Sequence, residues 1–377
     1  MKKTFLYFCL LFIVQTAFAA DSLYVREQQI PILIDRIDNV LYEMRIPAQK
    51  GDVLNEITIQ IGDNVNLSDI QAIRLFYSGV EAPSRKGEHF SPVTYISSHI
   101  PGNTRKALES YSVRQDEVTT PLSRTVKLTS KQPMLKGINY FWVSIQMKPE
   151  TSLLAKVATT IPNAQINNKP IDITWKGKVD ERHVGIGVRQ AGDDGSAAFR
   201  IPGLVTTNNG TLLGVYDIRY NSSVDLQEKI DIGVSRSTDK GQTWEPMRVA
   251  MTFKQTDGLP HGQNGVGDPS ILVDEKTNTI WVVAAWTHGM GNERAWWNSM
   301  PGMTPDETAQ LMLVKSEDDG KTWSEPINIT SQVKDPSWYF LLQGPGRGIT
   351  MQDGTLVFPI QFIDATRCLL YTSDAAD

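Results

Sequence analysis

The chain has 377 residues, with 37 Lys and Arg against 42 Asp and Glu, so its formal net charge is −5. This slight acidic excess and the lack of a basic stretch exclude the electrostatic footprint of a nucleic-acid-binding protein, and we expect no nucleic-acid partner. Length and a hydrophobic content of 40% predict two globular domains behind an N-terminal leader.

Residues 1–20 predict a secretory signal peptide. Two lysines precede an apolar run from Phe5 to Val14, which is too short to cross a bilayer, and Ala17-Phe18-Ala19 offers an A-x-A cleavage site. We therefore expect export to the periplasm, the outer surface or the medium, and no later segment predicts a transmembrane span. Cys9 lies in the leader and Cys368 is the only other cysteine, so we expect no disulfide in the mature protein.

Residues 21–178 predict a β-sandwich. Period-two alternation marks Glu56–Ile61 and Arg124–Leu128, whereas Ile73–Tyr77 and Asn139–Ile145 are apolar enough to form buried strands. Because no stretch here has a strong helical period, a two-sheet β fold is favoured. Two roles stay open for this domain: it binds carbohydrate, or it supports the domain that follows.

A charged stretch, Trp175–Arg182, predicts the boundary to a second domain of residues 181–377. That domain contains one sequence pattern twice, S-x-D-x-G-x-T-W, at Ser237–Trp244 and again at Ser316–Trp323. We expect each copy to form a hairpin turn in which the aspartate accepts backbone amides and the glycine takes positive φ. The tryptophan would pack onto an apolar layer, so the boxes predict a repeated fold rather than a catalytic site.

The repeat is longer than the box. Strand–turn–strand patterns centre on Asn209, Thr277 and Asp353, a spacing of roughly 70 residues. In the first two units a box hairpin follows, which completes four strands per unit. Four-stranded units repeated around an axis are typical of a β-propeller.

Arg200 stands in the run Phe199-Arg200-Ile201-Pro202, and its planar, permanently charged guanidinium is suited to pair with both oxygens of a carboxylate. Together with the two boxes, this motif resembles the bacterial exo-sialidases (neuraminidases), and most closely those of Bacteroides-type bacteria. The resemblance covers about residues 181–366. It implies an all-β protein in which a β-sandwich precedes the first half of a six-bladed β-propeller.

The resemblance also implies roles for five residues. Arg200 matches the first of three arginines that hold the sialic acid carboxylate, and Arg219 matches a second pocket arginine, near the 4-hydroxyl and the carboxylate. Asp225 matches the general acid/base of the family, and the spacing between these three positions fits the family pattern. Asp268 resembles a ligand of a substrate hydroxyl, and Trp286 is placed in the lining of the N-acetyl pocket.

The implied activity is release of terminal sialic acid from glycoproteins, glycolipids and oligosaccharides, with retention of configuration. A carboxylic acid such as Asp225 protonates the leaving oxygen and then deprotonates water, while sialidases use a tyrosine nucleophile in place of a second carboxylate. We expect no cofactor or metal, since the five histidines, among them His261 and His288, lack ligand spacing. The alternative is a non-catalytic Asp-box propeller that binds glycan or protein.

One departure concerns the C-terminal end. The family's tyrosine, its glutamate and its two further arginines come from later blades than this chain has room for, and the resemblance stops after Thr366. The sequence therefore predicts a truncated sialidase, with residues after Thr366 that are foreign to the family. As written, such a chain is expected to fold poorly and to lack sialidase activity, because unclosed blades expose apolar faces and strand edges.

Overall fold

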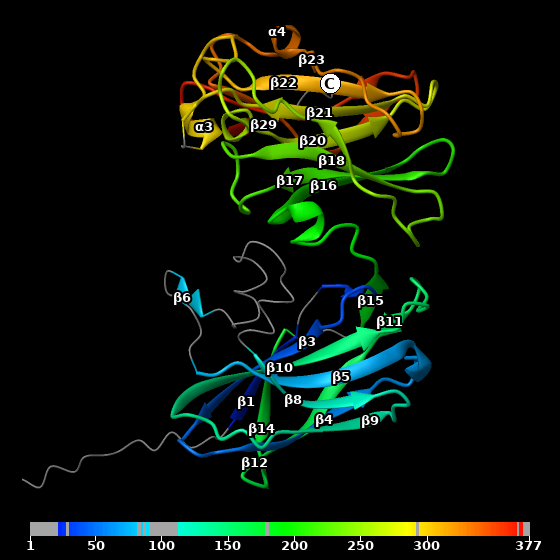
Figure 1. The fold of residues 1–377 in the computed structure, drawn as a ribbon, viewed down its shortest axis with the longest axis vertical. Coiled ribbons are helices and arrows are strands. Elements are labelled where there is room, and N and C mark those ends of the chain that lie inside the picture. Colours follow the sequence, from blue (N-terminus) through cyan, green and yellow to red (C-terminus); the bar gives the residue numbers. More distant parts are fainter. Residues whose placement is uncertain are drawn as a thin grey trace, which may run out of the picture. The chain divides into compact units, whose positions relative to one another are not determined.

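The computed structural model describes residues 22–27, 30–80, 84–85, 88–89, 112–177, 181–291, 294–367 and 369–371. The predicted signal peptide at residues 1–20, with Cys9, and also Cys368 lie outside them. The described chain is all-β, as predicted, and forms two compact units. The first unit ends at His183, and the second begins at Val184 and includes Leu33–Arg36 (Figure 1).

The first unit is a sandwich of two sheets. One sheet has the order β14-β1-β3-β10-β5-β8 and is antiparallel except for the parallel pair β1–β14; the other has the order β13-β12-β4-β9. Their strands are β1 (Ser22–Glu27), β3 (Asn39–Ala48), β4 (Leu54–Ile61), β5 (Ile70–Tyr77), β8 (Val113–Thr119), β9 (Thr125–Thr129), β10 (Gly137–Met147), β12 (Thr159–Ile166), β13 (Lys169–Pro170) and β14 (Asp172–Lys176). The shorter elements are β2 (Ile32–Leu33), η1 (Leu67–Asp69), β6 (Ser84–Arg85), β7 (Glu88–His89), β11 (Lys156–Val157) and β15 (Arg182–Gly185).

The core of the sandwich follows the alternation in the sequence. Ile57, Ile59 and Ile61 of β4 are fully buried, and β9 alternates strictly between exposed and buried side chains. Trp142 of β10 stacks on Phe76 of β5 with ring centroids 4.0 Å apart. The four strand predictions in this unit are confirmed: β9 alternates as a strand with one face on a core does, and the apolar runs in β5 and β10 are buried almost throughout.

The second unit is built of sheets that follow one another along the chain. The first has the order β16-β17-β18-β19, and the second has four antiparallel strands, β23-β22-β21-β20, with β25 added in parallel to β20. Their strands are β16 (Ala198–Thr206), β17 (Leu212–Arg219), β18 (Ile230–Ser237), β19 (Arg248–Met251), β20 (Val266–Val273), β21 (Ile280–Trp286), β22 (Gln310–Ser316), β23 (Ile327–Asn328) and β25 (Gly346–Arg347). These two sheets are the predicted propeller blades.

After the second blade come the sheet β24-β28-β29 and the hairpin β26-β27. Their bounds, with those of the short helical turns in this unit, are η2 (Asp193–Gly195), η3 (His261–Gln263), α3 (Ala295–Asn298), α4 (Thr330–Val333), β24 (Phe340–Gln343), β26 (Ile349–Thr350), β27 (Leu356–Val357), β28 (Ile360–Ile363) and β29 (Leu369–Tyr371). The two blades share one apolar core, to which Val215, Ile232, Ile271 and Val282 contribute fully buried side chains. The β-sandwich followed by propeller-type blades is thus confirmed, while a total of six blades stays a prediction.

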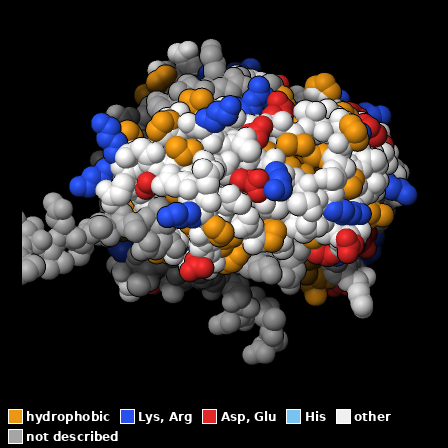
Figure 2. All heavy atoms as spheres, turned by 90° about the horizontal axis from the view of Figure 1, so that it is seen from below, with side chains coloured by type: hydrophobic (Ala, Val, Ile, Leu, Met, Phe, Trp, Pro, Cys, Tyr) orange, Lys and Arg blue, Asp and Glu red, His pale blue; other side chains and the backbone are white. Residues whose placement is uncertain are grey.

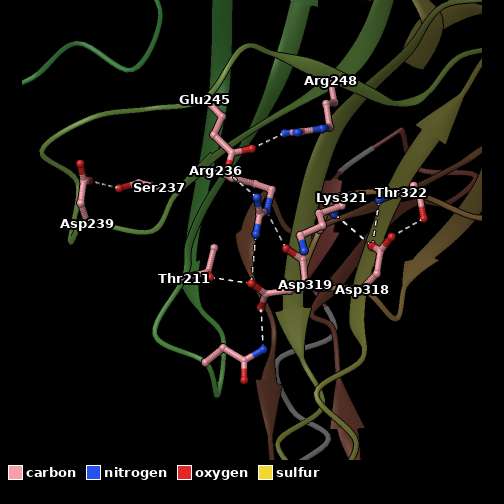
Figure 3. Close-up of polar contacts among 12 residues, drawn as sticks. Thr211, Arg236, Ser237, Asp239, Glu245, Arg248, Asp318, Asp319, Lys321 and Thr322 are labelled. Carbon is pink, nitrogen blue, oxygen red and sulfur yellow. Dashed lines mark hydrogen bonds and ion pairs between the residues drawn. The ribbon is translucent and has the colours of Figure 1, made fainter.

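Both boxes fold in the same way, as predicted. In the first, the hydroxyl and amide of Thr243 donate to Asp239 at 2.6 and 2.9 Å, and Gly241 has φ +85°. In the second, the hydroxyl and amide of Thr322 donate to Asp318 at the same distances, 2.6 and 2.9 Å (Figure 3). Each of these hydrogen bonds joins residues four positions apart, so the local sequence of the motif determines the turn.

The second box also reaches the first blade. Arg236 of β18, which is buried, donates to the backbone oxygen of Asp319 at 2.7 Å and pairs with its carboxylate at 3.1 Å (Figure 3). The hydroxyl of Thr211 donates to the same carboxylate at 2.5 Å. Arg236 is held on its other side by Glu245, which follows the first box. These contacts form an inter-blade clamp of Thr211, Arg236 and Asp319.

Asp318→Asn in the full-length protein should lower the melting temperature at pH 7, and this deficit should shrink as the pH falls towards 2. Burial opposes ionisation of Asp318, but bonds from Thr322 and nearby amides outweigh it and lower the pKa to about 2. A carboxyl whose folded pKa is depressed stabilises the fold above its unfolded pKa, and this contribution is lost as pH falls through the folded pKa. Thermal unfolding followed by circular dichroism at several pH values measures this.

Glu317→Gln is the matched control, since it removes the neighbouring charge and leaves the box intact. An Asp318→Asn deficit that stays constant from pH 7 to pH 2 would contradict the ionic origin of the effect.

The surface of the described residues mixes both charges. On the face drawn in Figure 2, lysine and arginine side chains lie among aspartate and glutamate side chains, with apolar side chains scattered between them. No helix in the described residues is long and apolar enough to span a bilayer.

Candidate active site

Two neighbouring strands of the first blade carry the arginines that the sequence singled out. Arg200 lies on β16 and Arg219 at the end of β17, and Arg200 is paired across the ladder with Asp217. The register of the pair β16–β17 shifts between Arg200 and Gly203, and Ile201 in this interval has φ +56°. Such an irregularity re-aims the side chains beside it, so Arg200 stands where the regular pleat of β16 is interrupted.

Asp225, in the loop after β17, meets both arginines. Oδ1 of Asp225 accepts a hydrogen bond from Arg200 Nη1 at 2.8 Å and from Arg219 Nη1 at 2.7 Å. The side chains of Arg200 and Asp225 are 41% and 39% exposed, whereas that of Arg219 is 1% exposed. The structure thus brings together three of the five predicted site residues, as a half-exposed ion pair above a buried arginine.

Arg219 is held by several protein partners. Its Nε and Nη2 donate to one oxygen of Asp217 at 3.0 and 2.7 Å, and its Nη1 also donates to the backbone oxygens of Ser223 and Val224. Asp268 lies 4.0 Å from Nη2. Arg219 thus holds the loop that carries Asp225. Its Nη2 is the nitrogen that faces Asp268.

Asp268 lies on β20, in the second blade, and its backbone is hydrogen-bonded to Asp217 of the first blade. Its amide donates to Oδ1 of Asp217 at 2.8 Å, and its φ is +58°. A non-glycine residue in this region is uncommon and is held there by its surroundings. The side chain is partly exposed, as a ligand of a substrate hydroxyl has to be.

Trp286, the fifth predicted residue, ends β21 and is buried. Its ring stacks on Phe253 with centroids 4.3 Å apart and lies 5.5 Å from the ring of His288. Its indole N–H has no hydrogen-bond partner within the described part of the chain. The hydrogen-bonded cluster of Arg200, Arg219 and Asp225 does not include it.

Asp217 is the residue that the sequence analysis missed. It is fully buried, and it contacts both Arg219 and Asp268. A signal was present, because Asp217 and Arg219 are two positions apart on one strand and so point to the same face. An aspartate inside an otherwise apolar strand is unusual unless it is paired.

The charges shift the proton affinities of the three carboxyls in different directions. Partial burial pushes the pKa of Asp225 up, but hydrogen bonds and positive charge from Arg219 and Arg200 outweigh it, so this pKa lies below its ordinary value. Burial and the charge of Asp268 raise the pKa of Asp217 to about 7, against the pull of Arg219. Burial likewise raises the pKa of Asp268. Neighbouring carboxyls whose pKa values are shifted in opposite directions are typical of sites where protons are transferred.

His261 and His288 take part in hydrogen bonds outside this cluster. His261 Nε2 lies 2.8 Å from Asp231, whose other oxygen accepts the hydroxyl of Tyr220, and His288 Nδ1 lies 2.7 Å from Asn264. Among the described residues, no group of three or more His, Cys, Asp or Glu side chains is arranged to hold a metal ion.

Two family models match the chain. Residues 20–170 match the N-terminal domain of BNR-repeat neuraminidase, and residues 201–376 match the BNR repeat-like domain. The second match continues past Thr366, and β29 pairs with β28 in the same region. The prediction that the resemblance stops at Thr366 was therefore wrong: it rested on single motifs, which the last residues lack, whereas the family pattern extends over the whole repeat.

Relatives of known name match as well. A sialidase from Bacteroides fragilis (strain YCH46) is 59% identical over 384 residues, which is 99% of this chain and 70% of the relative. A sialidase from Paraclostridium sordellii is 37% identical over 171 residues, or 43% of this chain and 39% of the relative. The solved structure of the Hadza microbial sialidase Hz136 has a TM-score of 0.78 and 61% identity, covering 94% of this chain and 69% of that one. The chain belongs to the BNR-repeat sialidase family of glycoside hydrolases.

Proposed function

We propose that the full-length protein is a retaining exo-α-sialidase in which Arg200 binds the substrate carboxylate and Asp225 acts as general acid/base. The observation that carries this assignment is the half-exposed pair of Arg200 and Asp225, 2.8 Å apart. A cation that binds a carboxylate and an acid that serves the adjacent anomeric carbon have to be neighbours. A propeller used only for binding has no need of the acid.

The pair supports an exchange of partners during catalysis. The carboxylate of an incoming sialoside would pair with the guanidinium of Arg200, whose Nη1 now donates to Asp225 and to the backbone oxygen of Ser223. Asp225 then loses one cation and gains an anionic neighbour, and both changes raise its pKa. It takes up a proton and becomes the acid that the free protein, with its lowered pKa, does not offer.

The chemical steps follow from that state. Asp225 transfers its proton to the glycosidic oxygen as the bond from the anomeric carbon to that oxygen breaks. In the scheme of the family, a tyrosine attacks the anomeric carbon, and Asp225 then removes a proton from the water that releases the sugar. The identity of that tyrosine stays a prediction of the family resemblance.

Asp268 and Trp286 complete the proposed pocket. The partly exposed carboxylate of Asp268 is suited to accept a hydrogen bond from a sugar hydroxyl, and Trp286 is assigned to the lining of the N-acetyl pocket from the family resemblance. We also propose that the protein is exported and acts on terminal sialic acids of glycoproteins, glycolipids or oligosaccharides outside the cytoplasm.

The test is hydrolysis of a fluorogenic sialoside by the full-length protein, with the first-formed anomer identified by proton NMR. Release of the α-anomer first supports retention. Release of the β-anomer first would refute the retaining scheme, and binding of sialylated glycans without hydrolysis would favour the non-catalytic alternative.

A further inference from the structure

Asp217 is a fully buried carboxylate at the centre of the site. One of its oxygens accepts Nε and Nη2 of Arg219, at 3.0 and 2.7 Å, and the other accepts the amide of Asp268 at 2.8 Å. A buried carboxylate is costly unless donors and a countercharge surround it. Asp217 has three such donors, from both blades.

Through Arg219 this carboxylate reaches Asp225. The Nε–Nη2 edge of the guanidinium faces Asp217, and Nη1 at its opposite side faces Asp225 at 2.7 Å. Because the guanidinium is planar and rigid, fixing one edge fixes the direction of the other. The position of Asp225 therefore depends on a residue that it does not contact.

The second oxygen of Asp217 orients the other blade. It holds the amide of Asp268, which has φ +58°. The preceding residue is Gly267, where an added Cβ would lie 3.5 Å from both oxygens of Asp217. The backbone of β20 thus approaches this carboxylate closely, and both Asp225 and Asp268 take their positions from it.

We propose that Asp217 is a positioning residue of the sialidase reaction, which orients Arg219 and, through it, the general acid/base Asp225. This inference rests on the proposed function of Asp225. The charged groups around Asp225 are Arg200 from β16, Arg219 from β17 and Asp268 from β20. Since Arg200 exchanges partners when substrate binds, Arg219 is the cation that stays with Asp225 throughout.

Asp217→Asn is the sharpest test, because it keeps the shape of the side chain and replaces one of its two acceptor oxygens with an NH₂ group. An amide has one oxygen and one NH₂ group, so in either orientation its NH₂ faces an N–H of Arg219 or of Asp268. In both orientations Arg219 also loses the negative charge with which it pairs, so its guanidinium is held less firmly. In the full-length protein we expect kcat to fall by about 10- to 100-fold for a natural sialoside, as a misplaced catalytic group does.

Two readouts separate positioning from stability. The loss should be smaller for a substrate with a good leaving group, because that substrate needs less of the acid. In a carbon-13 NMR titration of aspartate-labelled protein, the pKa of Asp225 should rise, because its contact with Arg219 is loosened. Asp319→Asn is the matched control: it disrupts the inter-blade clamp, so it should lower stability and move neither readout.

Asp217→Glu carries the same test if Asp217→Asn does not fold, since it keeps the charge and moves the carboxylate away from its present contact with Arg219. An unchanged pKa of Asp225 together with equal losses for good and poor leaving groups would overturn the inference. A wild-type protein that fails to hydrolyse sialosides, but in which the variant moves the pKa of Asp225, would instead refute the proposed function and keep the structural link.

Discussion

Asp225→Ala in the full-length protein should lower kcat by about 10²- to 10⁴-fold for natural sialosides, the usual contribution of a positioned proton donor. The loss should be much smaller for a sialoside whose leaving group has a low pKa, because departure of that group needs little protonation. KM should change less than kcat, since Arg200 is freed rather than removed. Steady-state kinetics with a series of aryl sialosides measures the dependence on leaving group.

The control for this variant is Asp364→Ala. Asp364 is a partly exposed carboxylate in the same unit that accepts hydrogen bonds from Thr366 in a turn, and its loss should leave the kinetics unchanged. Equal losses for all leaving groups in Asp225→Ala would contradict its role as the acid.

Arg200→Ala should raise KM and lower kcat/KM by about 10- to 100-fold, the size expected when a charged hydrogen-bonding group is lost. Arg200→Lys should recover only part of this, because an ammonium cannot pair with both oxygens of a carboxylate. The variant also removes a cation that lowers the pKa of Asp225, so this pKa should rise in the free protein. Substrate-saturation curves, with carbon-13 titration of the aspartates, measure both effects.

Arg248→Lys serves as the comparison, since Arg248 forms a similar partly exposed ion pair with Glu245 away from Asp225. If Arg200→Ala lowers kcat and leaves KM unchanged, the assignment of Arg200 to the substrate carboxylate is wrong.

The parts of the molecule that the sequence predicted well are those with local causes. In the box at Ser316–Trp323 the hydrogen bonds of Ser316 and Asp318 that form the turn join residues at most four positions apart, so the motif determines the turn locally. The sandwich strands were predicted from period-two alternation in two cases and from continuous apolar runs, which are buried, in the other two. The family spacing predicted the neighbourhood of Arg200 and Asp225, and the ion pair between them agrees with it.

The features that could not be predicted from the sequence depend on contacts between segments that are distant along the chain. The near-complete burial of Arg219 arises where β17 meets β20, and no local pattern marks it. Asp217 was missed although its partner Arg219 lies two residues away, because its contact with Asp268, 51 residues away, exists only between the packed blades. Trp286 was placed in the pocket by analogy alone, and its stacking on Phe253 is a further contact that only the packed blades create.

The inter-blade clamp has a consequence for how the propeller opens. Because Asp319 belongs to the turn of the second blade while Arg236 and Thr211 belong to the first, the turn cannot unfold without exposing a buried guanidinium in its neighbour. Repeat proteins unfold cooperatively because of such interactions between neighbouring repeats. Backbone amides of β18 and of the second box should therefore exchange with deuterium through one shared opening event, so that the two blades behave as a single unit of local unfolding.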